Sequence, residues 1–324
     1  MRALLAACLL SVGIYLAGAT MLLDRPLTHG LLMAELNAKL ARGAAIAGPK
    51  LVILAGSNGP YSHRCEAMEP ITARPCVNAG VAVGIGLDYL FARWDALLRP
   101  GDAIYLPMEP AQYTVRRLAN ATGPDAAIMA RHDRVVVRGL AAERWAGAAF
   151  PLDLRGIAMS VLEMALHTSG FRDPRPAEGA TNAWGDHIGH DASRAATGAL
   201  AAMVVTQPDA AQIAAGHGSA LIAAFTRRMV ARGVIVLGGL SAGFADTPLT
   251  PPAIAAIAVI YTGNGGDFVM LANRSRYARD NFFDGPEHLH EAAQIAHARA
   301  VAVALAPYLP ALPGPRVSAR AGSD

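Results

Sequence analysis

Five short apolar segments, separated by longer stretches with helical spacing, constrain the fold of this chain more than any other feature. They span residues 51–55, 75–78, 103–106, 234–237 and 268–271. Residues 84–98 carry apolar side chains three or four positions apart, as one face of a helix requires. Strands that alternate with helices are typical of a parallel sheet covered on both faces. The sequence therefore predicts an α/β protein, a three-layer α/β/α domain with a five-stranded parallel sheet.

The predicted domain runs from residue 49 to residue 310, and one long segment within it departs from the alternation. Residues 111–200 are rich in Gly, Pro, Asn and Asp, and we interpret them as an insertion that caps one end of the sheet. We expect residues 25–48 to form a stalk or linker that contains one short helix. Residues 311–324 contain prolines and a polar ending, which predicts a disordered tail.

The N-terminal segment, residues 1–24, predicts export. An uncharged, largely apolar run covers residues 3–23 and is long enough to cross a bilayer as a helix. Small residues at 17–19 also match a signal-peptide cleavage site, so a membrane anchor and a removed signal peptide are both open. The apolar run continues past that site, which favours an anchor in the inner membrane. Either alternative places the rest of the chain in the periplasm.

Charge and metal-ligand spacing argue against two classes of function. The chain has 28 basic and 25 acidic residues, a formal net charge of +3. Its arginines are scattered and form no basic stripe interleaved with aromatic residues, so we expect no nucleic-acid partner. No cluster of Cys and His has zinc-ligand spacing. His187 and His190 form a pair without a third ligand, so we expect no metal site.

Two of the three cysteines, Cys65 and Cys76, lie in the part of the chain that we expect to be exported, whereas Cys8 lies in the apolar run. An oxidising compartment permits a disulfide between Cys65 and Cys76. Two separately buried thiols are the alternative, because free cysteine is among the most buried residue types. The sequence leaves both alternatives open.

A serine directly after the first predicted strand is the first candidate for chemistry. Ser57 stands in the segment Ala-Gly-Ser-Asn-Gly, and ligands of open parallel sheets bind beyond the carboxyl ends of the strands. A tight strand-to-helix turn would expose the serine together with backbone N–H groups that can hold an oxyanion. Taken alone, the segment also fits a turn whose serine merely caps the next helix.

The second candidate lies just before the last predicted helix. A serine nucleophile needs a histidine to accept its proton and a carboxylate to orient that histidine. Asp284 and His288 stand on one loop in the segment Phe-Phe-Asp-Gly-Pro-Glu-His-Leu, close enough for an orienting hydrogen bond. A lone His288 would be read as a helix-start histidine without a partner. Together with Ser57, the pair predicts a catalytic triad.

A serine after the first strand and an Asp–His pair before the last helix together resemble the SGNH (GDSL-like) hydrolase superfamily over residues 50–308. The resemblance implies the flavodoxin-like fold and a Ser57-His288-Asp284 triad. It also assigns the oxyanion hole to the N–H groups of Ser57 and of Gly80, which follows the second strand in Asn-Ala-Gly.

The sequence departs from the family pattern in three places. The aspartate that usually precedes the nucleophile is missing, and the spacing from Asp284 to His288 is one residue longer than usual. The family also has an asparagine after the third strand as a further oxyanion donor, whereas this chain has Glu109 nearby. An ionised carboxylate only accepts hydrogen bonds, so Glu109 is not expected to replace the asparagine. This weakens the assignment of the oxyanion hole but leaves the triad intact.

The segments Ala-Gly-Ser-Asn, Cys-Val-Asn-Ala-Gly, Pro-Gly-Asp and Phe-Phe-Asp…His-Leu are similar to a subgroup of this superfamily. Its members are encoded beside bacterial cellulose and other exopolysaccharide synthases. The resemblance implies a periplasmic esterase, deacetylase or acyltransferase that acts on O-acyl groups of an exopolysaccharide, cellulose included, without a cofactor. It also suggests a polysaccharide synthase complex as a partner. The alternative is a non-catalytic accessory protein that keeps the fold and binds glycan or the synthase.

A rival nucleophile is Ser241, because Gly-Leu-Ser-Ala-Gly matches the Gly-x-Ser-x-Gly elbow of α/β-hydrolases. That elbow leads straight into a helix, whereas Ser241 is followed by a proline-containing segment, residues 244–252. Too few strands follow to complete that fold. We therefore expect an ordinary glycine-rich loop.

Several polar residues are weaker candidates for contacts with substrate. His63 and Arg64 lie close to Ser57 in the sequence, but a solvated helix face would explain them equally well. We also include Asn78 and Glu109, which follow the second and third strands. Trp184, Asp186 and His187 could contact a sugar ring, since an aromatic face suits carbohydrate, although a packed loop tryptophan is the plainer interpretation of Trp184.

Overall fold

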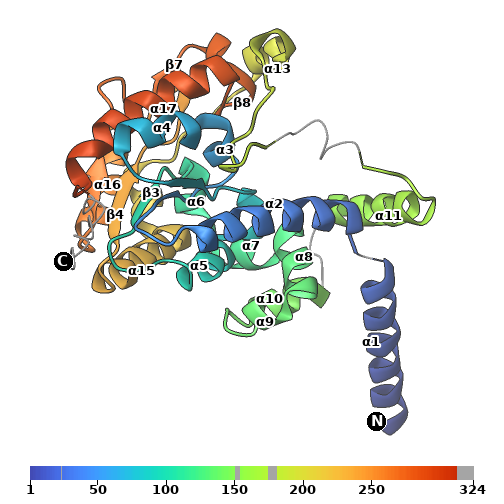
Figure 1. Ribbon diagram of the computed structural model, residues 1–324. Coiled ribbons are helices and arrows are strands. Elements are labelled where there is room, and N and C mark those ends of the chain that lie inside the picture. The colour runs from blue at the N-terminus through green and yellow to red at the C-terminus, as the bar shows by residue number, and fades with distance from the viewer. Residues whose placement is uncertain (23, 150–153, 174–180, 312–324) are drawn as a thin grey trace, which may run out of the picture.

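The computed structural model describes residues 1–22, 24–149, 154–173 and 181–311. An α/β fold is built on one five-stranded parallel sheet with the strand order β2-β1-β3-β4-β6 (Figure 1). The strands are β1 (Leu51–Ile53), β2 (Cys76–Asn78), β3 (Ala103–Leu106), β4 (Ile235–Gly239) and β6 (Asp267–Val269). Counted along the chain, this is the order 2-1-3-4-5 of flavodoxin-like folds. The five predicted strands and the α/β class are confirmed.

The two faces of the sheet bury alternate side chains. Val52, Ile104 and Val236 belong to the core on one face, and Leu51 and Tyr105 belong to the core on the other. Successive residues of a strand point to opposite faces, so a strand with two buried faces is apolar throughout. This is why the strands read as continuous apolar runs rather than as alternating patterns.

Helices cover both faces, which gives the expected three layers (Figure 1). One core is covered by α2 (Pro26–Ala45), α5 (Leu87–Asp95), α15 (His217–Ala231) and α16 (Pro251–Thr262). The other is covered by α4 (Cys65–Thr72) and α17 (Glu291–Leu305). The short α3 (Asn58–Ser62) follows β1, and the hairpin β8 (Phe282–Gly285) and β9 (His288–Leu289) precedes α17.

The described part of the segment between β3 and β4 contains short helices joined by loops, and it adds no strand to the main sheet. It contains α6 (Pro110–Thr114), α7 (Arg117–Thr122), α8 (Pro124–His132), α9 (Arg134–Val137), α10 (Glu143–Ala149), α11 (Leu154–Thr168), α13 (Thr197–Ala202) and α14 (Ala210–Ala215). Ile128 and Ile213 are buried in the same core as α5 and α15. The predicted insertion therefore enlarges one layer of the domain, in addition to carrying the loop near residue 187 that reaches the carboxyl ends of the strands.

The prediction of a stalk at residues 25–48 is wrong. Leu32 and Leu36 of α2 are 7% and 1% exposed and belong to the main core. At Gly43 even a Cβ atom would lie 2.7 Å from the ring of Trp94. Leucines four positions apart form an apolar stripe on a helix, and here that stripe is buried against the domain. The apolar pattern was visible in the sequence, but its partner was not.

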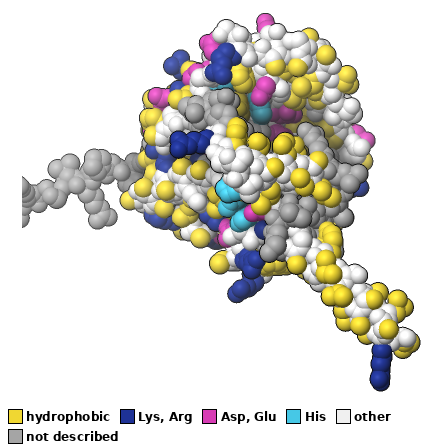
Figure 2. Space-filling view, turned by 90° about the vertical axis from the view of Figure 1, so that its right-hand side faces the viewer, with side chains coloured by type: hydrophobic (Ala, Val, Ile, Leu, Met, Phe, Trp, Pro, Cys, Tyr) yellow, Lys and Arg dark blue, Asp and Glu magenta, His cyan; other side chains and the backbone are white. Residues whose placement is uncertain are grey.

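The N-terminal helix α1 (Arg2–Leu22) projects away from the body of the protein and exposes apolar side chains such as Leu5 and Leu9 (Figures 1 and 2). Among the residues that the structure describes, no helix is long and apolar enough to span a membrane. The prediction of a spanning helix at the N-terminus therefore has no support from the structure. The predicted disordered tail lies outside the described residues, apart from residue 311.

Cys65 and Cys76 form a disulfide that links the start of α4 to the start of β2, with their Cα atoms 5.3 Å apart. Both residues are fully buried. Of the two alternatives that the sequence left open, the structure contains the disulfide. The bond fixes the connection between β1 and β2, which carries the turn described next.

Candidate active site

The turn that carries Ser57 lies at the carboxyl end of β1, which is one of the inner strands of the sheet. Ser57 occupies the N-cap position of α3 with helical backbone angles, but its side chain makes no capping hydrogen bond. The Ser57 hydroxyl is therefore free to face outward from the turn. The alternative of a serine that only caps the helix does not describe this geometry.

Asp284 and His288 lie on the two strands of the β8–β9 hairpin, which the Gly-Pro-Glu turn connects. His288 pairs with Gly285 across the hairpin, and Asp284 directly precedes Gly285, so the hairpin brings Asp284 within hydrogen-bond distance of His288 despite the longer spacing. Ser62 of α3 holds the hairpin in place: its hydroxyl donates to the carbonyl oxygen of Glu287 at 2.5 Å and accepts from the N–H of Leu289 at 3.4 Å. One short helix thus begins at Ser57 and clamps the loop that carries its partners.

The three predicted triad residues form a continuous chain of hydrogen bonds. Nε2 of His288 lies 2.9 Å from Oγ of Ser57, and Nδ1 of His288 lies 2.7 Å from Oδ1 of Asp284. An ionised carboxylate can only accept, so Nδ1 carries the ring proton and Nε2 is left to accept the Ser57 proton. Partial burial acts to raise the pKa of Asp284, but the hydrogen bond and charge of His288 outweigh it and lower that pKa. This is the arrangement that a serine nucleophile requires.

Tyr61 of α3 fixes the orientation of the His288 ring. It stacks on His288 with 4.3 Å between ring centroids and an interplanar angle of 15°. Its other side stacks on His187 at 4.2 Å and 20°. Burial raises the pKa of Tyr61 to about 12, and the charges of Asp284 and Glu35 act in the same direction. Tyr61 is therefore neutral at physiological pH and packs on His288 without a charge of its own.

Three glycines bring Gly80 against the Ser57 turn. A Cβ atom at Gly80 would lie 2.5 Å from the carbonyl oxygen of Gly56 and 2.9 Å from Cα of Gly59. Backbone can approach this closely only where side chains are absent. The residue predicted as the oxyanion glycine thus lies beside the residue predicted as the nucleophile.

Lys39 of α2 forms a hydrogen bond to the backbone of Gly80. Its ammonium group donates to the carbonyl oxygen of Gly80 and, at 2.6 Å, to Oε1 of Glu35. Lys39 is only 2% exposed, and its stem packs close to Gly185, where a Cβ atom would lie 3.0 Å from Cγ of Lys39. A buried charge needs such partners. The helix that the sequence suggested as a stalk is thus connected directly to the site.

Two further carboxyl groups, those of Glu109 and Glu287, lie near the Ser57 turn and His288. Oε1 of Glu109 accepts from the N–H of Asn58 at 3.3 Å, so Glu109 stands at the nucleophile turn. Burial raises the pKa of Glu109, although the charge of His288 and the Asn58 N–H oppose this. Burial and repulsion from Glu109 raise the pKa of Glu287 to about 7. Glu109 thus lies beside the Ser57 turn, but its contact with substrate stays a prediction, and Glu287 was not anticipated from the sequence.

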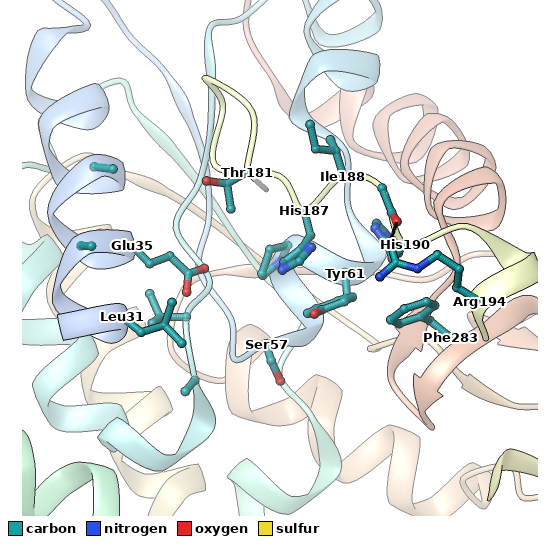
Figure 3. A pocket seen from close by; sticks show the side chains of 16 residues that line it. Leu31, Glu35, Ser57, Tyr61, Thr181, His187, Ile188, His190, Arg194 and Phe283 are labelled. Atoms are coloured by element: carbon teal, nitrogen blue, oxygen red, sulfur yellow. Dashed lines mark hydrogen bonds between the residues drawn. The ribbon is translucent and has the colours of Figure 1, made fainter. Parts of the chain in front are cut away.

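Ser57 opens into a groove of about 610 Å³ (Figure 3). In the close-up, Glu35 and Leu31 of α2 lie on one side, and Phe283 and Arg194 lie on the other. Between them lie Tyr61 and the loop that carries His187 and His190. The groove is lined by Leu31, Ala34, Glu35, Ala38, Ser57, Pro60, Tyr61, Val81, Ala82, Thr181, His187, Ile188, Gly189, His190, Arg194 and Phe283.

None of the five weaker sequence candidates His63, Arg64, Asn78, Glu109 and Trp184 is among the residues that line this groove, whereas His187 is. His63 is fully buried between Tyr105 and His297. The Asn78 amide is also buried, where it donates to the carbonyl oxygens of Gly59 and His63 and to Asp186. Both residues pack or bond inside the protein and lie outside the groove lining, so the structure does not place them against a ligand in this groove.

Two other candidates, Arg64 and Trp184, pack against charged partners. Arg64 forms ion pairs with Glu66 and Glu291, at 2.9 and 2.8 Å. Trp184 packs at the edge of the smaller core, with the Arg42 guanidinium carbon 5.2 Å from its ring centroid. The plainer interpretation of Trp184 as a packed loop tryptophan therefore describes its position.

Ser241, the rival nucleophile, is 2% exposed and leads into the two-residue strand β5 (Gly243–Phe244) rather than a helix. Its carbonyl oxygen accepts from Arg276 at 3.1 Å. Within the described residues, no histidine or carboxylate bonds to its hydroxyl. The expectation of an ordinary loop agrees with this geometry.

Tyr61, Glu35, Lys39 and Phe283 are the residues that sequence reasoning missed. Tyr61 follows Ser57 by one helical turn, so its place near the nucleophile could have been anticipated. Glu35 and Lys39 had no such signal, because only the packing of α2 brings them to the site. His190 was considered only as a metal ligand, whereas His187 was considered both as a metal ligand and as a contact to a sugar ring. The described residues contain no group of three or more potential metal ligands.

The fold and the site together define an α/β protein with a hydrogen-bonded Ser-His-Asp arrangement at the carboxyl edge of its sheet. Comparisons with protein-family models, curated proteins and solved structures give no match for this chain. The functional assignment therefore depends on the residues themselves.

Proposed function

We propose that this protein is a serine esterase of the SGNH type that removes or transfers O-acyl groups, acetyl groups above all, on an exopolysaccharide such as cellulose. The observation that carries the proposal is the chain of two hydrogen bonds from Ser57 through His288 to Asp284, at 2.9 and 2.7 Å. Through these two hydrogen bonds the nucleophile, the base and the orienting carboxylate each have the partner that acyl transfer requires.

In the proposed mechanism, Oγ of Ser57 attacks the acyl carbonyl carbon while Nε2 of His288 takes the hydroxyl proton. The negative charge moves to the carbonyl oxygen, where the backbone N–H groups of Ser57 and Gly80 would stabilise it. Collapse of the tetrahedral intermediate breaks the ester bond, and His288 returns its proton to the departing glycan hydroxyl. Asp284 stabilises the imidazolium that exists between the two transfers.

The acyl group is then bound to Ser57 as an ester, and a second nucleophile must release it. Water, deprotonated by His288, gives the free acid and makes the protein a hydrolase. A hydroxyl group of another glycan residue gives a new ester and makes it a transferase. Both routes regenerate Ser57 and His288, and neither consumes a cofactor.

For location, the proposal places the domain in the periplasm, attached to the inner membrane through α1 or released by cleavage after it. The Cys65–Cys76 disulfide supports an oxidising compartment, and the exposed apolar residues of α1 support contact with lipid. A polysaccharide synthase complex is the partner that we propose there. A reporter enzyme fused to the C-terminus should show periplasmic activity, and cytoplasmic activity would contradict this location.

The proposal is tested by acetate release from an O-acetylated exopolysaccharide. The wild-type protein should release acetate, and Ser57→Ala should abolish the release by removing the nucleophile. Ser241→Ala is the matched control, since it removes the same atom from a serine at the end of another strand, and it should keep the activity. Equal release by wild type and Ser57→Ala would contradict the proposal. A wild-type protein without activity on any acylated glycan would favour a glycan-binding accessory protein.

A further inference from the structure

His190 is a buried polar side chain that lines the groove without a hydrogen-bond partner. It is 2% exposed, and neither Nδ1 nor Nε2 makes a hydrogen bond to any residue that the structure describes. Most buried polar side-chain atoms in proteins have a partner. A histidine that lies beside a catalytic groove with both nitrogens free is therefore ready to bond to whatever enters the groove.

The rings around His190 form one wall of the groove beside the nucleophile (Figure 3). Its centroid lies 5.2 Å from that of Tyr61 and 5.7 Å from those of His187 and Phe283, in edge-on geometry. Nδ1 of His187 is also buried without a partner in the described structure. The wall thus combines ring surface with several unpaired ring nitrogens, and Tyr61 connects it directly to His288.

Hydrogen bonds to its backbone hold the loop that carries the two histidines in place. Glu291, the first residue of α17, donates its N–H to the carbonyl oxygen of His190 at 3.0 Å and accepts from the N–H of Gly189 at 2.9 Å. The N–H of His187 bonds to the carbonyl oxygen of Pro60 at 3.1 Å. A site preorganised in this way loses little entropy when a ligand binds.

The chemistry of the wall selects its ligand. Burial, together with the neighbouring His187, lowers the pKa of His190 to about 4, and burial also lowers the pKa of His187. A neutral imidazole offers one donor and one acceptor, and a hydroxyl group can satisfy either. Arg194 and Glu35 carry opposite charges at opposite sides of the groove, so neither an anionic nor a cationic ligand is favoured overall. An uncharged, hydroxyl-rich ligand fits best.

We propose that His190 and His187 form a glycan subsite, in which their free ring nitrogens bind hydroxyl groups of a sugar unit next to the acylated one. This proposal rests on the proposed function, because Ser57 must act on an ester within the same groove. The subsite would make the enzyme select acylated polysaccharide over small acyl esters. Its effect would appear in the discrimination between substrates rather than in the chemical step.

The test compares two substrates that share the acyl group. One is 4-nitrophenyl acetate, which has no sugar hydroxyl groups for His190 to bind, and the other is a partially O-acetylated cello-oligosaccharide. His190→Phe keeps an aromatic ring in place but removes both nitrogens. The ratio of kcat/KM for the oligosaccharide to that for 4-nitrophenyl acetate should fall about 10-fold or more, since a site built to bond a hydroxyl loses discrimination without its polar groups.

Two further variants make the comparison specific. His190→Gln keeps a donor and an acceptor, and it should retain more of the ratio than His190→Phe. His167→Phe makes the same substitution on the exposed surface of α11, and it should leave the ratio unchanged. An unchanged ratio in His190→Phe would mean that water alone satisfies these nitrogens, and it would overturn the subsite.

A measurement on the wild-type protein keeps the test independent of variant folding. Cello-oligosaccharides without acetyl groups should inhibit hydrolysis of 4-nitrophenyl acetate competitively if they occupy the groove, and absence of inhibition would also overturn the subsite. Failure of the proposed function looks different. In that case Ser57→Ala would keep its activity on both substrates, whatever the variants at residue 190 do.

Discussion

Two serines follow parallel strands of the same sheet, and among the described residues only Ser57 is hydrogen-bonded to a histidine that a carboxylate holds. Ser57 lies after β1 and bonds to His288, whereas Ser241 lies after β4, is 2% exposed, and bonds to no histidine within the described residues. The Ser241 turn is the better match to a known sequence motif. The comparison shows that a sequence motif can predict the shape of a turn. Whether the serine in that turn has a histidine partner depends on a loop far away in the sequence.

The supports of the two turns differ as much as their partners do. The Ser57 turn packs against Gly80, and α3 clamps the β8–β9 hairpin through Ser62. After Ser241 the chain instead forms β5, which pairs with β7 (Arg276–Tyr277). Arg276 fills the space there, where a Cβ atom at Gly243 would overlap its guanidinium group. The Ser57 turn thus presents its serine to a groove, whereas the Ser241 turn is buried and filled by Arg276.

The largest expected effect concerns the general base. His288→Ala should lower kcat for ester hydrolysis by about 10⁴-fold or more, because triad members act as a unit. The double variant Ser57→Ala/His288→Ala should be little worse than either single variant. Steady-state kinetics with 4-nitrophenyl acetate would measure this. Additive losses in the double variant would mean that Ser57 and His288 act separately, and the contrast with Ser241 would lose its basis.

A smaller loss is expected at the orienting carboxylate. Asp284→Asn should lower kcat by about 10²- to 10⁴-fold, because an amide at this position no longer holds the His288 tautomer in which Nε2 accepts a proton. The side chain of Asp284 is 46% exposed, so solvent can replace part of its effect and the lower end of this range is expected. A fully active Asp284→Asn protein would remove Asp284 from the mechanism.

The next effect tests whether α2 supports the oxyanion hole. Lys39→Met removes the ammonium group that bonds to the carbonyl oxygen of Gly80, and kcat should fall about 10-fold while KM changes little. Removing one partner of a buried hydrogen bond costs about 1–3 kcal/mol, so thermal stability should also decrease. Glu35→Gln is the matched control, because it leaves the Lys39–Gly80 bond in place. A stability loss without any change in kcat would limit Lys39 to a structural role.

The smallest expected effect is a pH dependence of the free energy of unfolding, which arises from Glu287 in the turn of the β8–β9 hairpin. The pKa of Glu287 is raised to about 7 by burial and by Glu109, so the folded state binds a proton there that the unfolded chain releases near its ordinary pKa of about 4.3. Stability linked to Glu287 is therefore greatest below pH 4 and falls as the pH rises toward 7. Glu287→Gln removes the ionisable group and therefore the decrease in stability at high pH. It should raise Tm at pH 8 by about 2–4 °C and leave it nearly unchanged at pH 4.5. An equal change at both values would contradict the account.

The sheet and the three residues of the triad could be predicted because their signals are local. Strands buried on both faces are apolar throughout, as residues 51–53 show, and Ser57, Asp284 and His288 stand next to recognisable strand and helix boundaries. The chemistry of acyl transfer then requires them to meet. The prediction needed no knowledge of the packing between β1 and the last helix.

The walls of the groove could not be predicted in this way. Leu32 and Leu36 showed an apolar stripe, but the sequence did not tell which surface would bury it, so α2 was mistaken for a stalk. His63 was chosen because it is polar and close to Ser57 in the sequence, and Asn78 because it is polar and follows the second strand, yet both are fully buried. Polarity alone cannot distinguish a side chain that faces a groove from one that bonds inside the core.

The most direct test of the central claim is to label the protein with a fluorophosphonate probe and to map the modified residue by mass spectrometry. The probe reacts with serines that a neighbouring base activates. The account predicts one label per chain on the peptide that contains Ser57, and no label on the Ser57→Ala protein. Labelling of Ser241, or no labelling of a correctly folded protein, would contradict it.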